Sequence, residues 1–379
     1  QQPLICTVEK IERKKENKNP PLLFNLAELQ NVCSKLFKIS PDETLSIVQD
    51  LYEKKLVTYP RTDARVLSTA VAKEIYKNIS GLRNYPQAGE AAQGALELGA
   101  YKNIAKTRYT NDKQITDHYA IIPTGQGLGA LKGLSLTAQR VYETIVRRFL
   151  SIFYPPAVYQ KVSLVTKMEN ESFFSSFKVL LSEGYLKIAA NSFAKKSMAE
   201  ASGKTPESEG EGEVSCDEAL LAALQKLKKG DILNINGLGI KEGETSPPKR
   251  YNSGSMILAM ENAGQLIEDE DLRSQIKGSG IGTSATRAEI LKKLFNIRYL
   301  SLNKKTQVIT PTLQGEMIYD VVNCSIRQLL NPELTASWEK GLTYVAEGSI
   351  TEQEYMDKLE HFVRIRTKQV EDSHFQYAL

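Results

Sequence analysis

The strongest constraint on the fold is a change of hydrophobic periodicity part-way along the chain. Up to about residue 150 the apolar residues recur at three- and four-residue spacing, which is typical of amphipathic helices. From Ala157 to about Gly243 short runs of β-branched and aromatic residues indicate strands, and beyond Pro248 the helical spacing returns. A chain of 379 residues with this order is expected to form a multidomain α+β protein.

Composition excludes several classes of protein. No apolar run approaches the roughly 18 residues of a membrane helix, so neither a membrane span nor a signal peptide is predicted. Lys and Arg number 49 against 45 Asp and Glu, so affinity for nucleic acid must come from local patches. The four cysteines form no CxxC pair and the three histidines no metal constellation, so we expect no zinc, no disulfides and a reducing cytoplasm.

Local signals place the main elements. The chain opens without Met on a strand at Leu4–Val8, which predicts a piece of a longer protein, and the charged stretch Lys10–Lys18 is predicted to be a connector. Ser40-Pro41 predicts a helix start, with an extended segment near Tyr59 after the helix. This order is compatible with a winged-helix unit.

A second unit of the same kind is expected near the C-terminus. Ala288–Phe295 fits a helix, and the two runs that follow it fit a hairpin around Asn303–Thr306.

The segment Thr58–Asp63 is the sharpest candidate for chemistry. A phenol has a pKa of about 10 in water and needs a neighbouring cation to act as a nucleophile. Arg61 lies two positions beyond Tyr59, on the same side of an extended strand, and its planar fork can hold a phosphate. Such a tyrosine can attack a phosphodiester and become joined to it. Most Tyr-Pro-Arg tripeptides are turns, so a purely structural role stays open.

His118 is the second candidate. It lies where a basic and aromatic stretch meets an apolar one, and a histidine there can donate a hydrogen bond to a phosphate oxygen. The alternative is a histidine that bonds to its own backbone. The glycines of Gly125–Gly129 and Gly278–Gly282 lack the lysine of a nucleotide-binding loop, so no ATP is expected.

Thr283–Arg287 is the third candidate. Hydroxyls and free amides at a helix N-terminus bind phosphate well, and Arg287 would add charge. The competing interpretation is an ordinary helix start, in which Thr286 and Glu289 form a capping box.

Together these segments resemble a type IA DNA topoisomerase, and more closely the bacterial topoisomerase III branch. The resemblance rests on five short motifs in family order, and covers most of the chain except the acidic insert and the last residues: Leu56–Asp63, His118–Thr124, Glu244–Arg250, Gly280–Ala288 and Thr310–Gly315.

The resemblance implies a single-strand passage enzyme that keeps the 5′ end of the cut strand as a phosphotyrosine, works without ATP and reseals the strand. It implies that Tyr59 is the nucleophile, that Arg61 holds the scissile phosphate and that His118 assists. It also implies DNA contacts, for which we predict Thr62, Thr283, Ser284, Thr286 and Arg287.

The resemblance also implies a domain order within a toroidal clamp. Residues 1–20 would begin a β-rich arch, and 21–157 would form the helical domain with the tyrosine. Residues 158–246 would return to the arch, with an acidic, solvated insert near 200–218, and 247–379 would form a helical domain that guides single-stranded DNA.

Departures from the family pattern limit what the chain is expected to do alone. The TOPRIM module, which supplies the family's Mg²⁺ ligands, has no matching motif, and Ala64 replaces a frequent serine with an effect that the residues do not reveal. We therefore expect a monomer that binds single-stranded DNA, binds no metal itself and needs its own TOPRIM domain for turnover. A cellular helicase is a further expected partner, in a cytoplasmic, nucleoid-associated setting, with no membrane contact.

One rival belongs to another class: a non-catalytic winged-helix DNA-binding protein in which Tyr59 is buried. A rolling-circle relaxase would need a tight histidine cluster, and His118, His361 and His374 are scattered.

Overall fold

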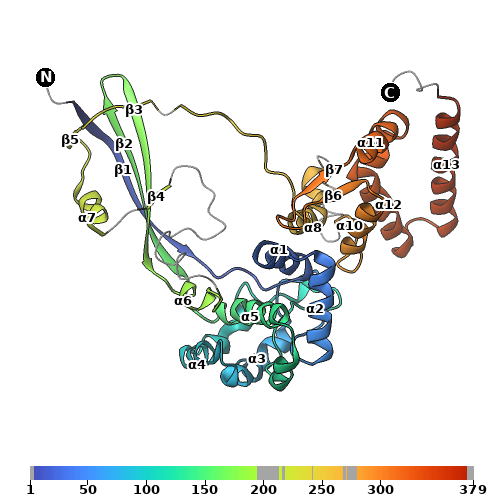
Figure 1. Ribbon diagram of the computed structural model, residues 1–379, viewed down its shortest axis with the longest axis horizontal. Helices are drawn as coiled ribbons and strands as arrows, with labels where there is room; N and C mark the ends of the chain where they lie inside the picture. Colours follow the sequence, from blue (N-terminus) through green and yellow to red (C-terminus); the bar gives the residue numbers. More distant parts are fainter. Residues whose placement is uncertain are drawn as a thin grey trace.

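The chain forms a strand-rich part, a helical body and a C-terminal helical unit (Figure 1), which confirms the expected multidomain α+β class. The computed structural model describes residues 4–193, 213–215, 218–240, 242–267, 270 and 280–373. Most of the predicted acidic insert, together with Gly278, Ser279 and His374, lies outside the described residues. The four predicted domain borders stay predictions.

The strand-rich part is a five-stranded sheet with the order β4-β3-β2-β1-β5. Its strands are β1 (Ile5–Lys18), β2 (Ala157–Met168), β3 (Glu171–Ser182), β4 (Glu213–Ser215) and β5 (Ile232–Asn234). All neighbours are antiparallel except β3 and β4. The first strand of the chain is therefore paired with strands more than 130 residues away, as Lys18 opposite Ala157 shows.

The prediction of a connector over Lys10–Lys18 is wrong, because β1 continues to Lys18 and stays paired with β2. Most of this stretch is solvent-exposed, so charged side chains are tolerated there and the apolar alternation that marks a half-buried strand is missing. Only the first part of β1 is covered. There Val8 packs with Val162, Leu164 and Leu224, the last of which belongs to α7 (Glu218–Lys226).

The helical body carries the largest hydrophobic core. Its α-helices are α1 (Leu26–Phe37), α2 (Pro41–Glu53), α3 (Thr69–Gly81), α4 (Gly89–Leu98), α5 (Leu136–Ser151) and α6 (Leu186–Ala189). The predicted start of α2 is confirmed, since the side chain of Ser40 accepts a hydrogen bond from the amide of Glu43. Asn25 caps α1 in the same way, with its side chain accepting from the amide of Glu28.

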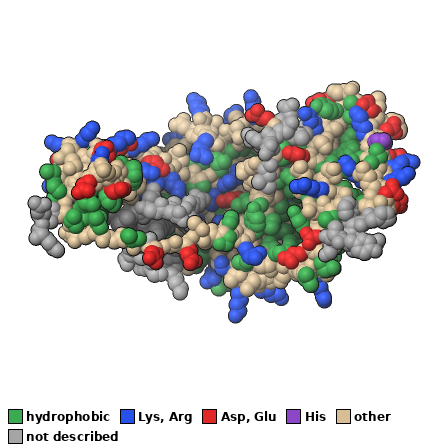
Figure 2. All heavy atoms as spheres, turned by 90° about the horizontal axis from the view of Figure 1, so that it is seen from above, with side chains coloured by type: hydrophobic (Ala, Val, Ile, Leu, Met, Phe, Trp, Pro, Cys, Tyr) green, Lys and Arg blue, Asp and Glu red, His purple; other side chains and the backbone are tan. Residues whose placement is uncertain are grey.

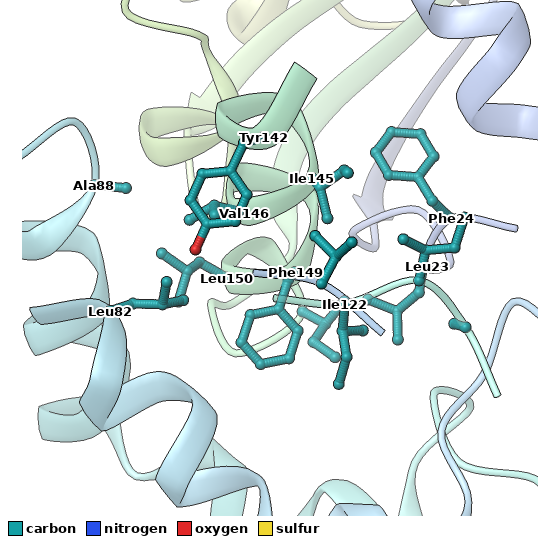
Figure 3. Packing of buried hydrophobic residues seen from close by; sticks show 14 of the residues in the cluster. Leu23, Phe24, Leu82, Ala88, Ile122, Tyr142, Ile145, Val146, Phe149 and Leu150 are labelled. Atoms are coloured by element: carbon teal, nitrogen blue, oxygen red, sulfur yellow. The ribbon is translucent and has the colours of Figure 1, made fainter. Parts of the chain in front are cut away.

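The helical pattern predicted up to about residue 150 is only partly met, because residues 107–135 contain extended segments and short 3₁₀ turns. The 3₁₀ helices in the described ranges are η1 (Leu82–Asn84), η2 (Ala100–Lys106), η3 (Asp112–Gln114), η4 (Leu128–Gly133), η6 (Ala263–Leu266) and η7 (Arg327–Leu330). In the core, Ile122 from an extended segment lies near Leu23 and Phe149, as Figure 3 shows. That segment is thereby anchored, and it is the one that carries His118.

The C-terminal helical unit follows an extended, exposed stretch at 235–240 and 242–250. Its described helices and strands include α8 (Ser253–Glu261), α10 (Arg287–Asn296), β6 (Leu300–Leu302), β7 (Ile309–Pro311), α11 (Leu313–Ser325), α12 (Pro332–Ala346) and α13 (Glu352–Glu371). The predicted helix and hairpin are confirmed here.

This unit packs on the helical body through α8 and α1. A side chain on Gly254 would lie 2.6 Å from the Cα of Asn31, so only glycine permits the close approach of these two helices. Ile257 and Met260 of α8 pack with Ala27 of α1 in the same small core. The contact holds the two units together next to the loop that follows α2.

The last three helices, α11–α13, bury few of their side chains. Among the residues that the structure describes in α11–α13, only Ala336 is buried, while side chains such as Leu313, Met317 and Val363 are exposed. No helix in the described ranges combines the length and apolar character of a membrane span.

Candidate active site

The loop that carries Tyr59 is held by a second segment of the chain. The amide of Thr58 donates to the carbonyl oxygen of Ile122 at 3.0 Å, and the amide of Ile122 donates back to the Thr58 hydroxyl at 3.0 Å. That hydroxyl in turn donates to the carbonyl of Ala120 at 3.0 Å. The extended conformation predicted before Pro60 is thus stabilised by an extended segment 62 to 64 residues further along the chain.

Tyr59 lies against His118. The two rings have centroids 4.3 Å apart at an interplanar angle of 40°, and Tyr52 meets Tyr59 edge-on at 5.6 Å. Tyr59 is half-buried and His118 is exposed, so both side chains border solvent. The two residues that sequence reasoning paired are therefore neighbours, and the phenol is not enclosed in the apolar core.

Arg61 and Thr62 have different surroundings. Arg61 is exposed, and no hydrogen bond or ion pair joins it to another described residue. Thr62 is 4% exposed; its hydroxyl donates to the carbonyl of His118 at 2.8 Å and accepts from the amide of Ala64 at 3.1 Å. Thr62 therefore links the tyrosine loop to the histidine segment, and its hydroxyl is already used within the protein.

The start of α10 differs from the predicted capping box. Thr286 is the N-cap, as expected, but its side chain caps no helix amide; its hydroxyl accepts from the amide of Thr283 at 2.9 Å. The predicted capping box of Thr286 and Glu289 is therefore wrong, because the Thr286 hydroxyl stabilises the preceding turn instead. Thr283 and Thr286 are exposed and Ser284 is half-buried.

Arg287 does not face solvent. It is 1% exposed, and its Nη1 lies 2.8 Å from Oδ1 of Asp63, with further donation to the carbonyls of Ile281 and Gly282. The guanidinium is therefore used within the protein in this arrangement, and its predicted contact with DNA stays a prediction. Its partner Asp63 lies in the tyrosine loop, so Arg287 joins the two predicted motifs.

Sequence reasoning missed the acidic and amide groups around Arg287. Glu261 ends α8 and accepts from the Nδ2 of Asn25 at 2.6 Å. Burial raises the pKa of Glu261, with a further rise from the charge of Asp63, while Arg287, Asn25 and Arg65 act in the opposite direction. One signal was available: Glu261 is the only charged residue in an otherwise apolar and small-residue helix.

The predicted site residues thus form two groups. The loop after α2 presents Tyr59 and Arg61, and the neighbouring segment presents His118 next to them, while Thr283, Ser284 and Thr286 lie in the turn before α10. No group of three or more His, Cys, Asp or Glu side chains in the described ranges is arranged to hold a metal ion. Lys, Arg and acidic side chains are mixed over the face seen in Figure 2.

Comparison with known proteins gives a consistent result. Residues 2–357 match the family model described as DNA topoisomerase. The chain is 33% identical to DNA topoisomerase 3 of Bacillus licheniformis, over 94% of this chain and 46% of that protein, and 32% identical to that of Bacillus subtilis, over 97% and 47%. It spans about half the length of these relatives.

A solved structure shares the fold. Full-length topoisomerase I from Thermotoga maritima matches with a TM-score of 0.64 and 22% identity, over 97% of this chain and 54% of that one. The match to the family model includes the tyrosine loop, the histidine segment and the start of α10. The chain therefore belongs to the type IA DNA topoisomerase family.

Proposed function

We propose that this chain carries the nucleophile of an enzyme that cuts and reseals one DNA strand. The observation that carries the proposal is the placement of Tyr59: its ring lies against His118 in a solvent-bordering loop, with exposed Arg61 two residues further on. A buried structural tyrosine would have its hydroxyl enclosed, as Tyr142 has in the core. The non-catalytic alternative predicted such burial for Tyr59.

The chemistry needs no nucleotide. The phenol of Tyr59 gives up its proton as its oxygen attacks phosphorus, and the bond from phosphorus to the 3′ oxygen breaks. The 3′ oxygen takes up a proton, so no net proton is gained or lost. Because one phosphoester replaces another, attack by the 3′ hydroxyl restores the strand and returns the proton. Arg61 can hold the phosphate, and His118 can donate a hydrogen bond to a non-bridging oxygen.

The proposal places the metal site in another domain of the complete enzyme. The described residues form no metal cluster, so they do not fit a Mg²⁺ site of their own. We propose that Mg²⁺ and the acid for the leaving oxygen belong to the TOPRIM domain of the complete enzyme, and that this chain alone binds single-stranded DNA without turnover. No ATP and no zinc enter the proposal.

Strand passage requires the cut ends to separate. We propose that the helical body with Tyr59 moves away from the C-terminal helical unit while the strand is cut, and that a second strand passes through the gap. Thr283, Ser284 and Thr286 remain proposed DNA contacts, since Thr283 and Thr286 are exposed.

The test combines this chain with a TOPRIM module from a relative, Mg²⁺ and a 5′-end-labelled or 3′-end-labelled single-stranded oligonucleotide, followed by denaturation. A covalent adduct that retains the 3′ label is expected with the parent chain and absent with Tyr59→Phe. Tyr52→Phe is the matched control, because Tyr52 is exposed and touches Tyr59 without belonging to the motif. An adduct that persists in Tyr59→Phe contradicts the proposal. If the parent forms none where an intact relative does, the chain is a binding protein.

A further inference from the structure

A cavity lies where the strand-rich part joins the helical body, near α5 and α6 in Figure 1. Its volume is about 300 Å³, and it is walled by the end of β1, one face of α1, α5 and the segment around α6. Its described lining residues include none from the tyrosine loop, the histidine segment or the turn before α10, so the cavity shares no residue with the candidate active site. On α1 the lining follows the three- and four-residue spacing of one helix face: Glu28, Asn31, Val32, Lys35 and Leu36.

Two amide oxygens of the cavity lining lack a hydrogen-bond partner. The Oδ1 atoms of Asn31 and Asn191 are buried, and neither accepts a hydrogen bond from any described residue. Asn31 as a whole is only 5% exposed. A buried carbonyl oxygen without a donor is unfavourable, and in folded proteins such oxygens nearly always have a partner. The lining therefore favours a ligand that brings hydrogen-bond donors.

The segment that carries Asn191 is fixed in place. The amide and the hydroxyl of Ser192 donate to the two carboxylate oxygens of Glu143 in α5, at 2.6 and 2.7 Å. Glu143 is 3% exposed and is itself paired with Arg147 at 2.6 Å. These contacts hold the segment after α6 against α5, so this wall of the cavity is formed before a ligand arrives.

The charges that line the cavity disfavour a cation as the missing donor. Lys18, Lys35 and Arg148 line it, and Glu28 is the one acidic side chain in the described lining. Glu28 lies 3.8 Å from Arg148 and 3.8 Å from Arg65, so two guanidinium groups share its charge. A positive surrounding repels a metal ion or an ammonium group. It favours a neutral donor on a molecule that is negatively charged elsewhere.

The remaining walls are mostly apolar and include two aromatic side chains, Phe24 and Tyr185. The guanidinium of Arg148 covers the Phe24 ring at 4.2 Å and donates to the carbonyl of Leu22 at 3.0 Å, which holds this part of the wall in place. Apolar walls suit a flat ring better than a sugar or an extended polar chain. An amino group on such a ring is neutral and presents N–H donors, as in adenine and cytosine.

We propose that this cavity binds a nucleotide whose base carries an exocyclic amino group, adenine or cytosine. The amino group supplies the donors that the Oδ1 atoms of Asn31 and Asn191 lack, and the base lies against the apolar walls. The phosphate faces Lys35, which is exposed on the α1 face. A free nucleotide and a base of a DNA strand offer the same chemistry. The site goes beyond the proposed function, since none of its residues takes part in strand cutting.

The experiment measures the affinity of this chain for mononucleotides by isothermal titration calorimetry, without metal. dIMP has a carbonyl oxygen where dAMP has its amino group, and dUMP differs from dCMP in the same way. We expect dAMP to bind about tenfold or more tightly than dIMP, or dCMP than dUMP, because the carbonyl would leave the two buried oxygens unpaired. Deoxyadenosine and deoxycytidine, which lack the phosphate, should bind more weakly and with less dependence on salt.

Variants of this chain remove the two oxygens. Asn31→Leu and Asn191→Ala should each lower the preference for the amino group, and the double variant should bring the two affinities within about twofold of each other. Asn84→Ala is the matched control and should keep the preference of the parent, because Asn84 is exposed in η1 and lies outside the cavity. Circular dichroism checks that the variants fold, and if the double variant does not, the single variants carry the test.

Oligonucleotides identify the source of the base. An oligothymidylate with one central dA is compared with one that carries dI there, and dC is compared with dU in the same way. A preference in mononucleotides indicates a free nucleotide, and one seen only in oligonucleotides indicates a base of the strand.

Two results overturn the proposal: the amino group makes no difference in either form, or the preference is unchanged in both Asn31→Leu and Asn191→Ala. Water alone would then meet the two oxygens. No adduct is formed in these measurements, so either result leaves the proposed function as it stands, and failure of the adduct test leaves the measured affinities unchanged.

Discussion

Two loops of this protein carry the same kind of predicted phosphate-binding motif, and they use their arginines in opposite ways. The loop after α2 presents Arg61 to solvent next to Tyr59. The loop before α10 turns Arg287 inward, where it is 1% exposed and paired with Asp63. The first arginine is available to a ligand, and the second holds the first loop in place.

The difference teaches that a cation in a motif is not by itself a ligand contact. Arg61 follows a proline in a loop whose backbone is satisfied by other residues, so its side chain is not needed for the fold. Arg287 begins a helix at the contact of two units, where a carboxylate from a distant segment meets it. Replacing Arg61 by alanine should therefore change the rate of adduct formation, whereas replacing Arg287 by alanine should change the free energy of unfolding.

The largest effect is expected for Arg61→Ala. Loss of a phosphate-holding group that acts in the transition state should slow adduct formation about 10²- to 10³-fold, while affinity for single-stranded DNA falls only slightly. Rates of adduct formation and binding by fluorescence anisotropy check this. Equal losses in both would mean that Arg61 supplies only general phosphate affinity.

A smaller effect, in a different quantity, is expected for Arg287→Ala. Removing the buried guanidinium breaks its ion pair with Asp63 and should lower the free energy of unfolding by about 3 kcal/mol. Urea denaturation of the parent, Arg287→Ala and Arg61→Ala checks this, with Arg61→Ala expected within about 0.5 kcal/mol of the parent. If the two variants unfold alike, the contrast between the loops fails.

The smallest effect is a pH dependence. The pKa of Glu261 is raised by burial and by Asp63 above its ordinary value of 4.5, so the folded state holds this proton more tightly than the unfolded state. Stability from this group is therefore greatest below that ordinary value and is lost as pH rises through the folded pKa. Glu261→Gln should gain in free energy of unfolding relative to the parent between about pH 4 and about pH 8. A constant difference would contradict the raised pKa.

Local signals predicted much of the fold. Ser40-Pro41 marks the start of α2, and Pro60 keeps Tyr59 extended, because both effects act within a few residues. The neighbourhood of Tyr59 and His118 followed from the family resemblance. The segment that makes them neighbours is held by the hydrogen bonds between Thr58 and Ile122, a pairing without a local signal.

What escaped prediction depends on distant contacts. The long β1 strand is paired with β2 through backbone hydrogen bonds, which do not require apolar side chains at Lys10–Lys18. The ion pair of Asp63 and Arg287 joins residues 224 positions apart, and the role of Glu261 appears only where α8 meets α1. Charged side chains in two motifs look alike in sequence, and burial alone separates them.

The central claim is that the Tyr59 hydroxyl takes the end of the broken strand. The most direct measurement is mass spectrometry of the trapped adduct after digestion with trypsin and nuclease. Cleavage after Lys55 and Arg61 releases a peptide, residues 56–61, with Tyr59 as its only tyrosine. The account predicts that this peptide gains the mass of a nucleotide joined through its 5′ phosphate, and a nucleotide on any other peptide would contradict it.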